Sequence, residues 1–383
     1  MKHHGNVIII GSGLIGLSVA RELAGLGLHV TLLERGRVGH EASRAAAGML
    51  AAQAECDQPD AFFQLALKSR NMYPDWIREL EQEVQTSTGY RQSGILLVAT
   101  NEHEARTYEQ RAAWQREWGL RAEWIEPAEL AAFEPGLAAN LAGGLHVPDD
   151  HQIDSWRLCQ ALWQSAVIRG VEVHENCPVH SLRIENGRVR GVRTVHGDFS
   201  AEHVLVAAGS WSGQLLSGER TIPVRPVRGQ VLEAYAPPNF LKHVIFSEGC
   251  YLVPKSEGRL LIGATVEEAG FVKEAELGGL RRLLERAAAL VPEVDRLRAG
   301  PVHVGFRPAT PDLRPVLGPD ATVENLWWAC GHYRNGVLLT PVTGKIMAQW
   351  IVGQTPEVNI QLFGPQRFLN QQQKPAAAGS PTG

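Results

Sequence analysis

Short apolar runs and a helical repeat alternate at the start of the chain. Residues 6–10 form one continuous apolar run, and residues 29–33 form a second. Such runs are typical of strands buried in a parallel sheet. Between them, apolar residues recur at steps of three over 14–26, which is the pattern of an amphipathic helix. The N-terminus is therefore predicted to form a strand–helix–strand unit.

Helix and strand patterns continue along the rest of the chain. Apolar periodicity predicts helices over 61–85, 102–118, 156–169, 277–290 and 338–351. Short apolar or alternating runs predict strands over 94–100, 171–174, 181–185, 188–195, 204–207, 230–235, 250–254, 259–263 and 326–329. Asn186-Gly187, between two of these strands, predicts a hairpin turn beside the parallel sheet. The order predicts an α/β protein, and 383 residues suffice for two domains.

Charge and cysteine usage narrow the class of protein. A net charge of −4 gives no electrostatic basis for binding nucleic acid or an anionic membrane. Five scattered cysteines without a CxxC pair argue against a disulfide framework or a metal site and suit a reducing cytoplasm. The apolar run over 7–20 contains glycines and is followed at once by Arg21, unlike a secretion signal, and no run could span a bilayer. We expect a cytoplasmic protein with no metal, nucleic-acid or membrane partner. Whether it forms a homo-oligomer is left open. The low-complexity tail 369–383 is expected to be disordered.

Glycines follow the first predicted strand with the spacing GxGxxG. Gly11 permits a tight turn, Gly13 lets backbone N–H groups approach a pyrophosphate, and Gly16 allows close packing of helix on strand. The helix N-terminus adds partial positive charge at the same place. Glu34, at the end of the second strand, can accept hydrogen bonds from ribose hydroxyls. The unit predicts a dinucleotide site that suits either NAD or FAD.

Three further segments favour FAD over NAD. Small residues over 43–49 would let the backbone come close to a ligand. The strand at 204–207 runs into a glycine turn at Ala208 and Gly209. A second glycine turn at 331–336 precedes the last helix. A nicotinamide dehydrogenase needs no ligand-binding turn so far along the chain, whereas a flavin cofactor that extends across its domain does.

Four stretches carry a resemblance to a known family: SRAAAGMLAAQAECDQPDAFF (43–63), GCYLVPKSEGRLLIGAT (249–265), GFRPATPD (305–312) and GHYRNGVLLTP (331–341). With them, roughly residues 5–365 resemble the D-amino-acid oxidase and sarcosine oxidase superfamily of flavoproteins, and within it the glycine oxidases of thiamine biosynthesis. The resemblance implies a Rossmann-type FAD-binding domain and a second, α+β substrate domain built on an antiparallel sheet. The first would combine residues 1–86, 153–222 and 313–368, and the second residues 87–152 and 223–312.

The same resemblance assigns residues to the cofactor. Residues that match FAD contacts in these proteins are Leu14, Ile15, Glu34, Arg35, Ala42, Ser43, Ala47, Gly48, Met49 and Val179. Residues that match the loop beside the isoalloxazine ring are His332, Tyr333, Arg334, Asn335, Gly336, Val337 and Leu338. Some sarcosine oxidases bind flavin through a cysteine in the stretch equivalent to 305–318, and this chain has none there. FAD is therefore expected to be bound non-covalently.

Three side chains match a binding site for a substrate carboxylate: Arg307, Arg334 and Tyr251. A guanidinium meets a carboxylate with two parallel hydrogen bonds, and a tyrosine hydroxyl can add a third. Gly249 and Val266 stand where glycine oxidases can have a histidine and a methionine, so the pocket is expected to be roomier and to accept N-substituted or larger amino acids. The alternative is that neighbouring residues fill this space.

The resemblance implies oxidation of glycine or a related small or N-substituted amino acid. Hydride would pass from the α-carbon to flavin N5, the imine would hydrolyse, and oxygen would reoxidise the flavin to give hydrogen peroxide. No side chain is assigned as a general base, because the deprotonated amine suffices for hydride transfer. The alternatives are an oxidase of sarcosine or another N-alkylglycine, a D-amino-acid dehydrogenase, a tRNA-modifying flavoprotein and a non-catalytic flavin-binding protein. The acidic balance argues against RNA, and the paired arginines argue against a non-catalytic role.

Overall fold

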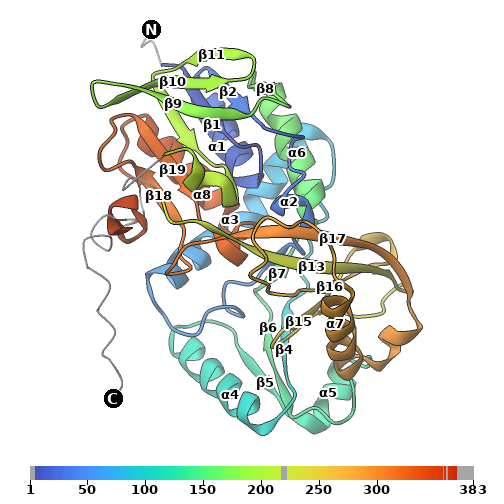
Figure 1. Ribbon diagram of the computed structural model, residues 1–383. Coiled ribbons are helices and arrows are strands. Elements are labelled where there is room, and N and C mark those ends of the chain that lie inside the picture. The colour runs from blue at the N-terminus through green and yellow to red at the C-terminus, as the bar shows by residue number, and fades with distance from the viewer. Residues whose placement is uncertain (1–4, 217–221, 357, 359–360, 369–383) are drawn as a thin grey trace, which may run out of the picture.

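The computed structural model describes residues 5–216, 222–356, 358 and 361–368 (Figure 1). The tail 369–383, expected to be disordered, lies outside the described residues. Two large sheets organise the described part, a six-stranded one in the upper half of Figure 1 and an eight-stranded one in the lower half. The α/β class predicted from the sequence is confirmed.

The six-stranded sheet has the strand order β18-β19-β12-β1-β2-β8. Its strands are β1 (Val7–Ile10), β2 (Val30–Leu33), β8 (Glu172–His174), β12 (His203–Val206), β18 (Val316–Pro319) and β19 (Leu326–Cys330). All neighbours are parallel except β18, which pairs antiparallel with β19 at the edge. Both faces of β1 are buried, which explains its continuous apolar sequence.

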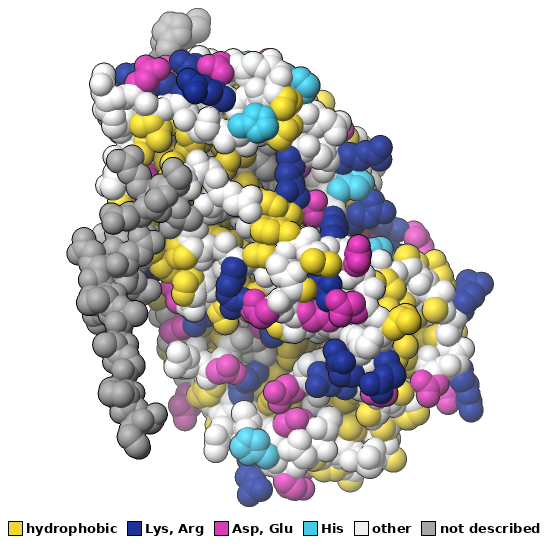
Figure 2. All heavy atoms as spheres, viewed as in Figure 1, with side chains coloured by type: hydrophobic (Ala, Val, Ile, Leu, Met, Phe, Trp, Pro, Cys, Tyr) yellow, Lys and Arg dark blue, Asp and Glu magenta, His cyan; other side chains and the backbone are white. Residues whose placement is uncertain are grey.

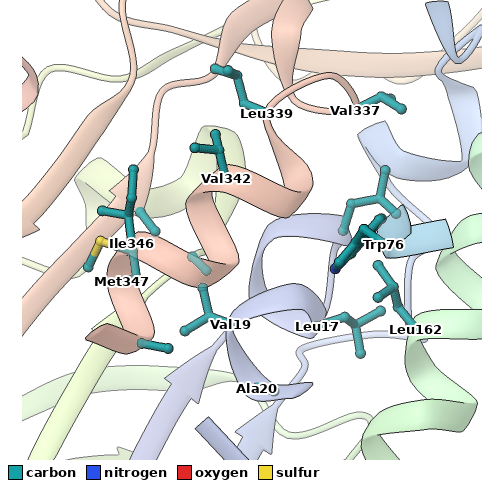
Figure 3. Packing of buried hydrophobic residues seen from close by; sticks show 14 of the residues in the cluster. Leu17, Val19, Ala20, Trp76, Leu162, Val337, Leu339, Val342, Ile346 and Met347 are labelled. Atoms are coloured by element: carbon teal, nitrogen blue, oxygen red, sulfur yellow. The ribbon is translucent and has the colours of Figure 1, made fainter. Parts of the chain in front are cut away.

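Four helices cover one face of this sheet and a small antiparallel sheet covers the other. The helices are α1 (Leu14–Gly25), α3 (Ala61–Val84), α6 (Ser155–Ile168) and α8 (Thr340–Ile351). Figure 3 shows their apolar side chains meeting in one core, with Leu17, Trp76, Leu162 and Val342 each from a different helix. The small sheet consists of β9 (Val179–Glu185), β10 (Arg188–Thr194) and β11 (Gly197–Ser200). The predicted hairpin between β9 and β10 is confirmed, and Asn186 and Gly187 both have positive φ, as the favoured two-residue turn requires.

The eight-stranded sheet has the order β17-β13-β16-β15-β14-β4-β6-β5. Its strands are β4 (Ile95–Ala99), β5 (Glu123–Ile125), β6 (Gly143–Val147), β13 (Arg225–Tyr235), β14 (Val244–Ser247), β15 (Cys250–Pro254), β16 (Arg259–Gly263) and β17 (Arg298–Ala309). Neighbours are antiparallel except β14 and β4. Helix α4 (Glu102–Glu117) packs in the core on one face, and α5 (Pro127–Phe133) and α7 (Leu277–Leu290) pack in the core on the other.

Short elements complete the described part. They are α2 (Ala42–Ala45), β3 (Met49–Leu50), β7 (His151–Gln152) and the 3₁₀ turns η1 (Gly209–Gln214), η3 (Ser256–Gly258), η4 (Pro292–Arg296), η5 (Tyr333–Asn335), η6 (Gln361–Phe363) and η7 (Pro365–Phe368). The strands of each large sheet come from the segments expected for each domain, while the domain boundaries themselves stay a prediction. Within the described ranges, no helix is both long and apolar enough to cross a membrane.

Most predicted elements are confirmed within two residues, including β15, β16 and α7 with the predicted bounds. The last helix begins at Thr340 instead of 338, with Pro341 in its first turn, where a missing N–H is tolerated. The predicted strand 230–235 is only the second half of β13, and β17, its partner along most of that length, was not predicted. Pairing with β17 extends β13 back to Arg225.

Candidate active site

A cavity of about 490 Å³ is lined by residues of both large sheets. One end lies at the glycine turn after β1, beside the carboxyl ends of the parallel strands, where such sheets bind ligands. The other end reaches β13, β15 and β17. The lining comes mainly from segments 10–15, 33–35, 41–49, 177–180, 207–211, 246–251, 305–308 and 329–337. Every predicted site residue lines this cavity except Gly16 and Leu338.

The glycine turn brings β1 and α1 into close contact at the first end. A Cβ atom on Gly16 would lie 2.0 Å from the Gly11 carbonyl oxygen, so this position has room only for glycine. The backbone N–H of Leu14 donates to Ser43 Oγ at 3.0 Å, and the cap residue Gly13 has no side chain to cover the helix end. The positive end of the α1 dipole therefore borders the cavity, as a pyrophosphate site requires.

Glu34 is held beside this turn by the backbone of its neighbours. Its Oε2 accepts hydrogen bonds from Ser12 N at 3.0 Å and Ser12 Oγ at 2.7 Å, and its Oε1 accepts one from Gly36 N at 2.9 Å. Oε1 keeps acceptor capacity for a ribose hydroxyl, whereas the two bonds from Ser12 use both lone pairs of Oε2. Arg35 stacks its guanidinium 3.4 Å from the ring centroid of Trp211, a cavity residue that the sequence prediction did not select.

The loop between β19 and α8 forms the wall at the middle of the cavity. Tyr333 has a φ of 49°, a left-handed conformation that a non-glycine residue adopts only when its surroundings hold it there. Two side chains of α3 hold the carbonyls that follow: Tyr73 donates to Val337 O, and Ser69 donates to Leu338 O at 2.6 Å. The Leu338 side chain is buried in the helix core and does not line the cavity, so a role of this residue beside the ring stays a prediction.

His332 is buried in the same loop. Its Nε2 lies 3.2 Å from Thr343 Oγ1, and burial lowers its pKa to about 3. The imidazole is therefore neutral at working pH and already has a hydrogen-bond partner. This supports the expectation that His332 does not act as a general base.

Arg307 and Tyr251 each rest on a glycine of the neighbouring strand. A Cβ atom on Gly229 would lie 2.5–2.7 Å from the Arg307 guanidinium, and one on Gly263 would lie 2.3–2.4 Å from the Tyr251 ring and hydroxyl. Arg307 Nη1 also donates to Thr265 O at 3.0 Å. Two strand glycines therefore make room for the two side chains and fix their orientation. Sequence reasoning missed both, although glycines inside strands often mark such close approaches.

Tyr251 keeps its hydroxyl proton. Burial is the main cause that raises its pKa to about 12, with Glu55 adding to the rise and Arg307 opposing it. A protonated hydroxyl can donate to a carboxylate, as the sequence prediction required. Arg334 lines the same end of the cavity with an exposed side chain, and its guanidinium lies 5.4 Å from the Tyr333 ring centroid.

Gly249 and Val266 have different surroundings. Val266 is 51% exposed and lines the cavity, so its small side chain leaves space there. A Cβ atom on Gly249 would lie 1.9 Å from Arg286 Nη1, which donates to Gly249 O at 3.2 Å. Arg286 of α7 therefore fills the place where a side chain at 249 would begin, and the predicted gain in space depends on Val266 alone.

Glu55 is a cavity residue that the sequence prediction did not single out. It lies five residues after Leu50, the end of β3, and lines the cavity with Tyr251, Arg307 and Arg334. Burial raises its pKa, and the two arginines oppose the rise. The available signal was an acidic residue directly after the mostly small and apolar run 45–54.

Comparison with known proteins finds relatives along nearly the whole chain. The bifunctional protein ThiO/ThiG of Trichormus variabilis is 37% identical over 96% of this chain, which covers 55% of that protein and thus spans about half its length. Glycine oxidase of Geobacillus kaustophilus is 36% identical over 97% of this chain and 99% of its own length. The crystal structure of glycine oxidase from Geobacillus kaustophilus matches with a TM-score of 0.91 and 35% identity, covering 96% of this chain and 99% of that one. A sequence model of the family described as FAD dependent oxidoreductase (DAO) matches residues 6–350, and the chain belongs to this family.

Proposed function

We propose that the chain is an FAD-dependent oxidase of glycine or a closely related small amino acid. The observation that carries the proposal is the grouping of Arg307, Arg334 and Tyr251 at one end of the cavity whose other end has the glycine turn and Glu34. The full-length similarity to glycine oxidase of Geobacillus kaustophilus supports it. The proposed overall reaction converts the amino acid, oxygen and water into the oxo acid, ammonia and hydrogen peroxide.

The residues that would hold FAD follow from their places in the cavity. The N–H groups at the start of α1 suit the pyrophosphate, Glu34 suits a ribose, and the loop 332–337 suits the ring. The close packing at Gly16 supports this assignment, because any larger residue would force the strand and helix apart. When bound, FAD supplies the hydride acceptor, and oxygen takes up the electrons.

The protein's own part in this reaction is to bind and orient the substrate. Arg307 and Arg334 provide permanent charge for the substrate carboxylate, and the Tyr251 hydroxyl provides a further donor. Fixing the carboxylate in this way fixes the α-carbon, which is how orientation contributes to the rate. His332 stays neutral, because its pKa of about 3 makes it too weak a base to take up a proton at working pH.

The rival functions differ from the proposed one in the substrate or in the electron acceptor. An N-alkylglycine oxidase needs the same carboxylate site and differs only in the space around the nitrogen. A D-amino-acid dehydrogenase differs in its electron acceptor. For a tRNA-modifying flavoprotein we find no surface support: on the face shown in Figure 2, Lys and Arg side chains are interspersed with Asp and Glu instead of forming a basic patch. We further propose that the protein works in a reducing compartment such as the cytoplasm, because its five cysteines are free and buried.

Peroxide release from a substrate panel tests the proposal. Glycine, sarcosine, D-alanine and D-proline are each incubated with the FAD-loaded protein, and oxygen uptake and peroxide are measured together. We expect at least one of them to give peroxide in a one-to-one ratio with oxygen. Turnover only with a quinone acceptor would identify a dehydrogenase, and no turnover with either acceptor would contradict the proposal.

A further inference from the structure

Three acidic side chains line the cavity, and Glu55 differs from the other two. Glu34 is held by Ser12 and Gly36, and Glu41 pairs with Arg35 at 3.0 Å and with Lys273 at 2.7 Å. Among the residues that the structure describes, no hydrogen bond or ion pair holds the Glu55 carboxylate. The substrate end of the cavity thus contains a carboxylate with free acceptor capacity.

The backbone that carries Glu55 is held in place on both sides. The buried carboxylate of Asp150 accepts hydrogen bonds from Gln53 N at 2.9 Å and from Ala54 N at 2.8 Å. Arg111 Nη1 donates to Ala54 O at 2.6 Å, and Glu55 N donates to Ala51 O at 3.2 Å. A fixed backbone keeps the Glu55 side chain in the cavity without a side-chain partner of its own, which is the arrangement expected of a group that waits for a ligand.

The charges around Glu55 match the two ends of an amino acid. Arg307 and Arg334 take the substrate carboxylate under the proposed function, and this leaves the ammonium group two bonds away. Burying a cation in such a cavity is costly unless an opposite charge meets it. Glu55 is the acidic side chain at this end, since Glu34 and Glu41 belong to the other.

The protonation of Glu55 is set by opposing neighbours. Burial is the largest effect and raises the pKa of Glu55. The charge of Asp150 also raises this pKa, whereas the charges of Arg334, Arg307 and Arg111 lower it. The net rise makes Glu55 a better proton acceptor than an ordinary glutamate. In return, Glu55 raises the pKa values of Arg334 and Tyr251, which keeps both groups in their donor forms.

We propose that Glu55 binds the amino group of the substrate and accepts a proton from it. In this step one N–H bond of the ammonium breaks, an O–H bond forms on the Glu55 carboxylate, and the electron pair stays on nitrogen. The substrate then carries the neutral amine that hydride loss from its α-carbon requires. The proposal rests on the proposed function and adds to it the residue that distinguishes an amino acid from a plain carboxylic acid.

Glu55→Gln tests this assignment, because it keeps the shape of the side chain and removes its charge. Anaerobic titrations of the FAD-loaded variant follow the flavin absorbance with glycine and, separately, with acetate and glycolate, which lack the amine. We expect affinity for the amino acid and kcat/KM to fall roughly ten- to hundredfold, the effect of losing a hydrogen bond to a charged group. Affinity for acetate and glycolate should stay within about twofold. The pH profile of kcat/KM should also lose the change that the titration of Glu55 causes in the wild-type protein.

Matched variants separate a local from a general effect. Asp75→Asn removes one charge from an 84% exposed position of α3 and is expected to leave the affinity for both ligand classes unchanged. Glu55→Asp keeps the charge but withdraws it by one methylene, and is expected to show a smaller selective loss of the same sign. If Glu55→Gln does not retain FAD, the same titrations are made with Glu55→Asp.

Two outcomes would overturn the assignment: equal losses for amino acids and plain acids, or no loss for either. Failure of the proposed function looks different. In that case the wild-type protein oxidises no amino acid, whereas failure of the Glu55 assignment leaves wild-type turnover intact and removes only the difference between the two ligand classes.

Discussion

At the scale of single residues, the substrate end is built from charged and polar side chains supported by glycines. Arg307 lies against Gly229, and Tyr251 lies against Gly263. Arg307 uses Nη1 for the Thr265 carbonyl, and within the described residues its Nη2 group and the Tyr251 hydroxyl keep their donors for a ligand. A methyl group on either glycine would push the side chain from its place, since its carbon would lie only 2.3–2.7 Å from side-chain atoms, well below van der Waals separation.

Arg334→Ala should keep FAD but lose most of the catalytic efficiency. Removing a bidentate, charge-assisted contact costs roughly 2–4 kcal/mol, which is about 30- to 1,000-fold in kcat/KM. Arg334→Lys should recover only part of this loss, because an ammonium cannot form the planar fork. Steady-state kinetics with the best substrate of the panel measures both. Arg281→Ala, at a 69% exposed position of α7, is the control, and near-normal turnover by Arg334→Ala would remove Arg334 from the site.

At the scale of elements, α3 connects the helix layer through an ion cluster at its C-terminal end. Glu83 accepts hydrogen bonds from Arg169 Nε and Ser165 Oγ of the α6 region, both at 2.6 Å, and lies 3.1 Å from Arg21 Nη2 of α1. Arg21 is 1% exposed, so it depends on its carboxylate partners. One carboxylate therefore ties three helices together.

Glu83→Gln should destabilise the protein in a pH-dependent way. Burial is the largest single effect on the pKa of Glu83 and raises it. The hydrogen bonds and charges of the two arginines and Ser165 together outweigh burial and lower this pKa to about 2 from an ordinary value of 4.5. Because the pKa of Glu83 is lower in the folded than in the unfolded protein, its ionised form stabilises the fold at pH values above about 4.5. This stability is lost as the pH falls from about 4.5 toward about 2. The expected difference at pH 7 is on the order of 3 kcal/mol.

Urea unfolding of the FAD-loaded protein at pH 7, 4 and 3 measures this difference. It should shrink as the pH falls, because wild-type Glu83 then becomes protonated as well. Glu79→Gln removes a 62% exposed partner of Arg21 and should cost far less at every pH. A penalty for Glu83→Gln that does not change with pH would show that the ionised carboxylate is not the cause.

The elements with regular patterns could be predicted from the sequence, and irregular ones could not. The strand–helix–strand unit and α7 follow simple apolar periods. Strand β17 contains Gly300, Pro301, Gly305 and Pro308, which interrupt its pattern, yet it pairs along β13 and carries Arg307. Pairing between distant strands overrides the local sequence here.

The site could be predicted where its residues lie in glycine turns and not where their roles depend on neighbours across the sheet. The loop 331–336 and the turn at Gly11 have signals within a few residues. The roles of Gly229 and Gly263 depend on side chains in adjacent strands, and that of Arg286 depends on how α7 packs. The free carboxylate of Glu55 becomes visible only when the arginines are placed beside it.

At the scale of the whole molecule, the described chain forms one continuous cavity from strands far apart in sequence. We expect the purified protein to be yellow and to release intact FAD on denaturation. Cys330 lines the cavity, but burial raises its pKa to about 12, so its thiol stays protonated and unreactive toward the flavin. Chromatography of the supernatant after acid precipitation measures free FAD, and flavin retained in the pellet would contradict non-covalent binding.

Substrate size is the second property of the whole cavity. Because only Val266 leaves space, we expect tolerance of one added alkyl group, with sarcosine at least as good as glycine and N-ethylglycine weaker. Val266→Met should reverse this preference, at about 0.8 kcal/mol per methylene, which is about fourfold in kcat/KM. Val272→Met changes a 50% exposed residue that does not line the cavity and should alter nothing. A tenfold preference of the wild type for glycine would show that the space is filled.

The hydrogen bonds from α3 to the loop before α8 also bear on how the protein is made. Ser69 and Leu338 are 269 residues apart, and Tyr73 and Val337 are 264 apart. On the ribosome, α3 emerges long before the loop it holds, since 264 residues separate Tyr73 from Val337. The left-handed Tyr333 backbone has no support until then. A nascent chain can form the glycine turn early, but we expect it to retain its cofactor only after residues 332–337 have followed.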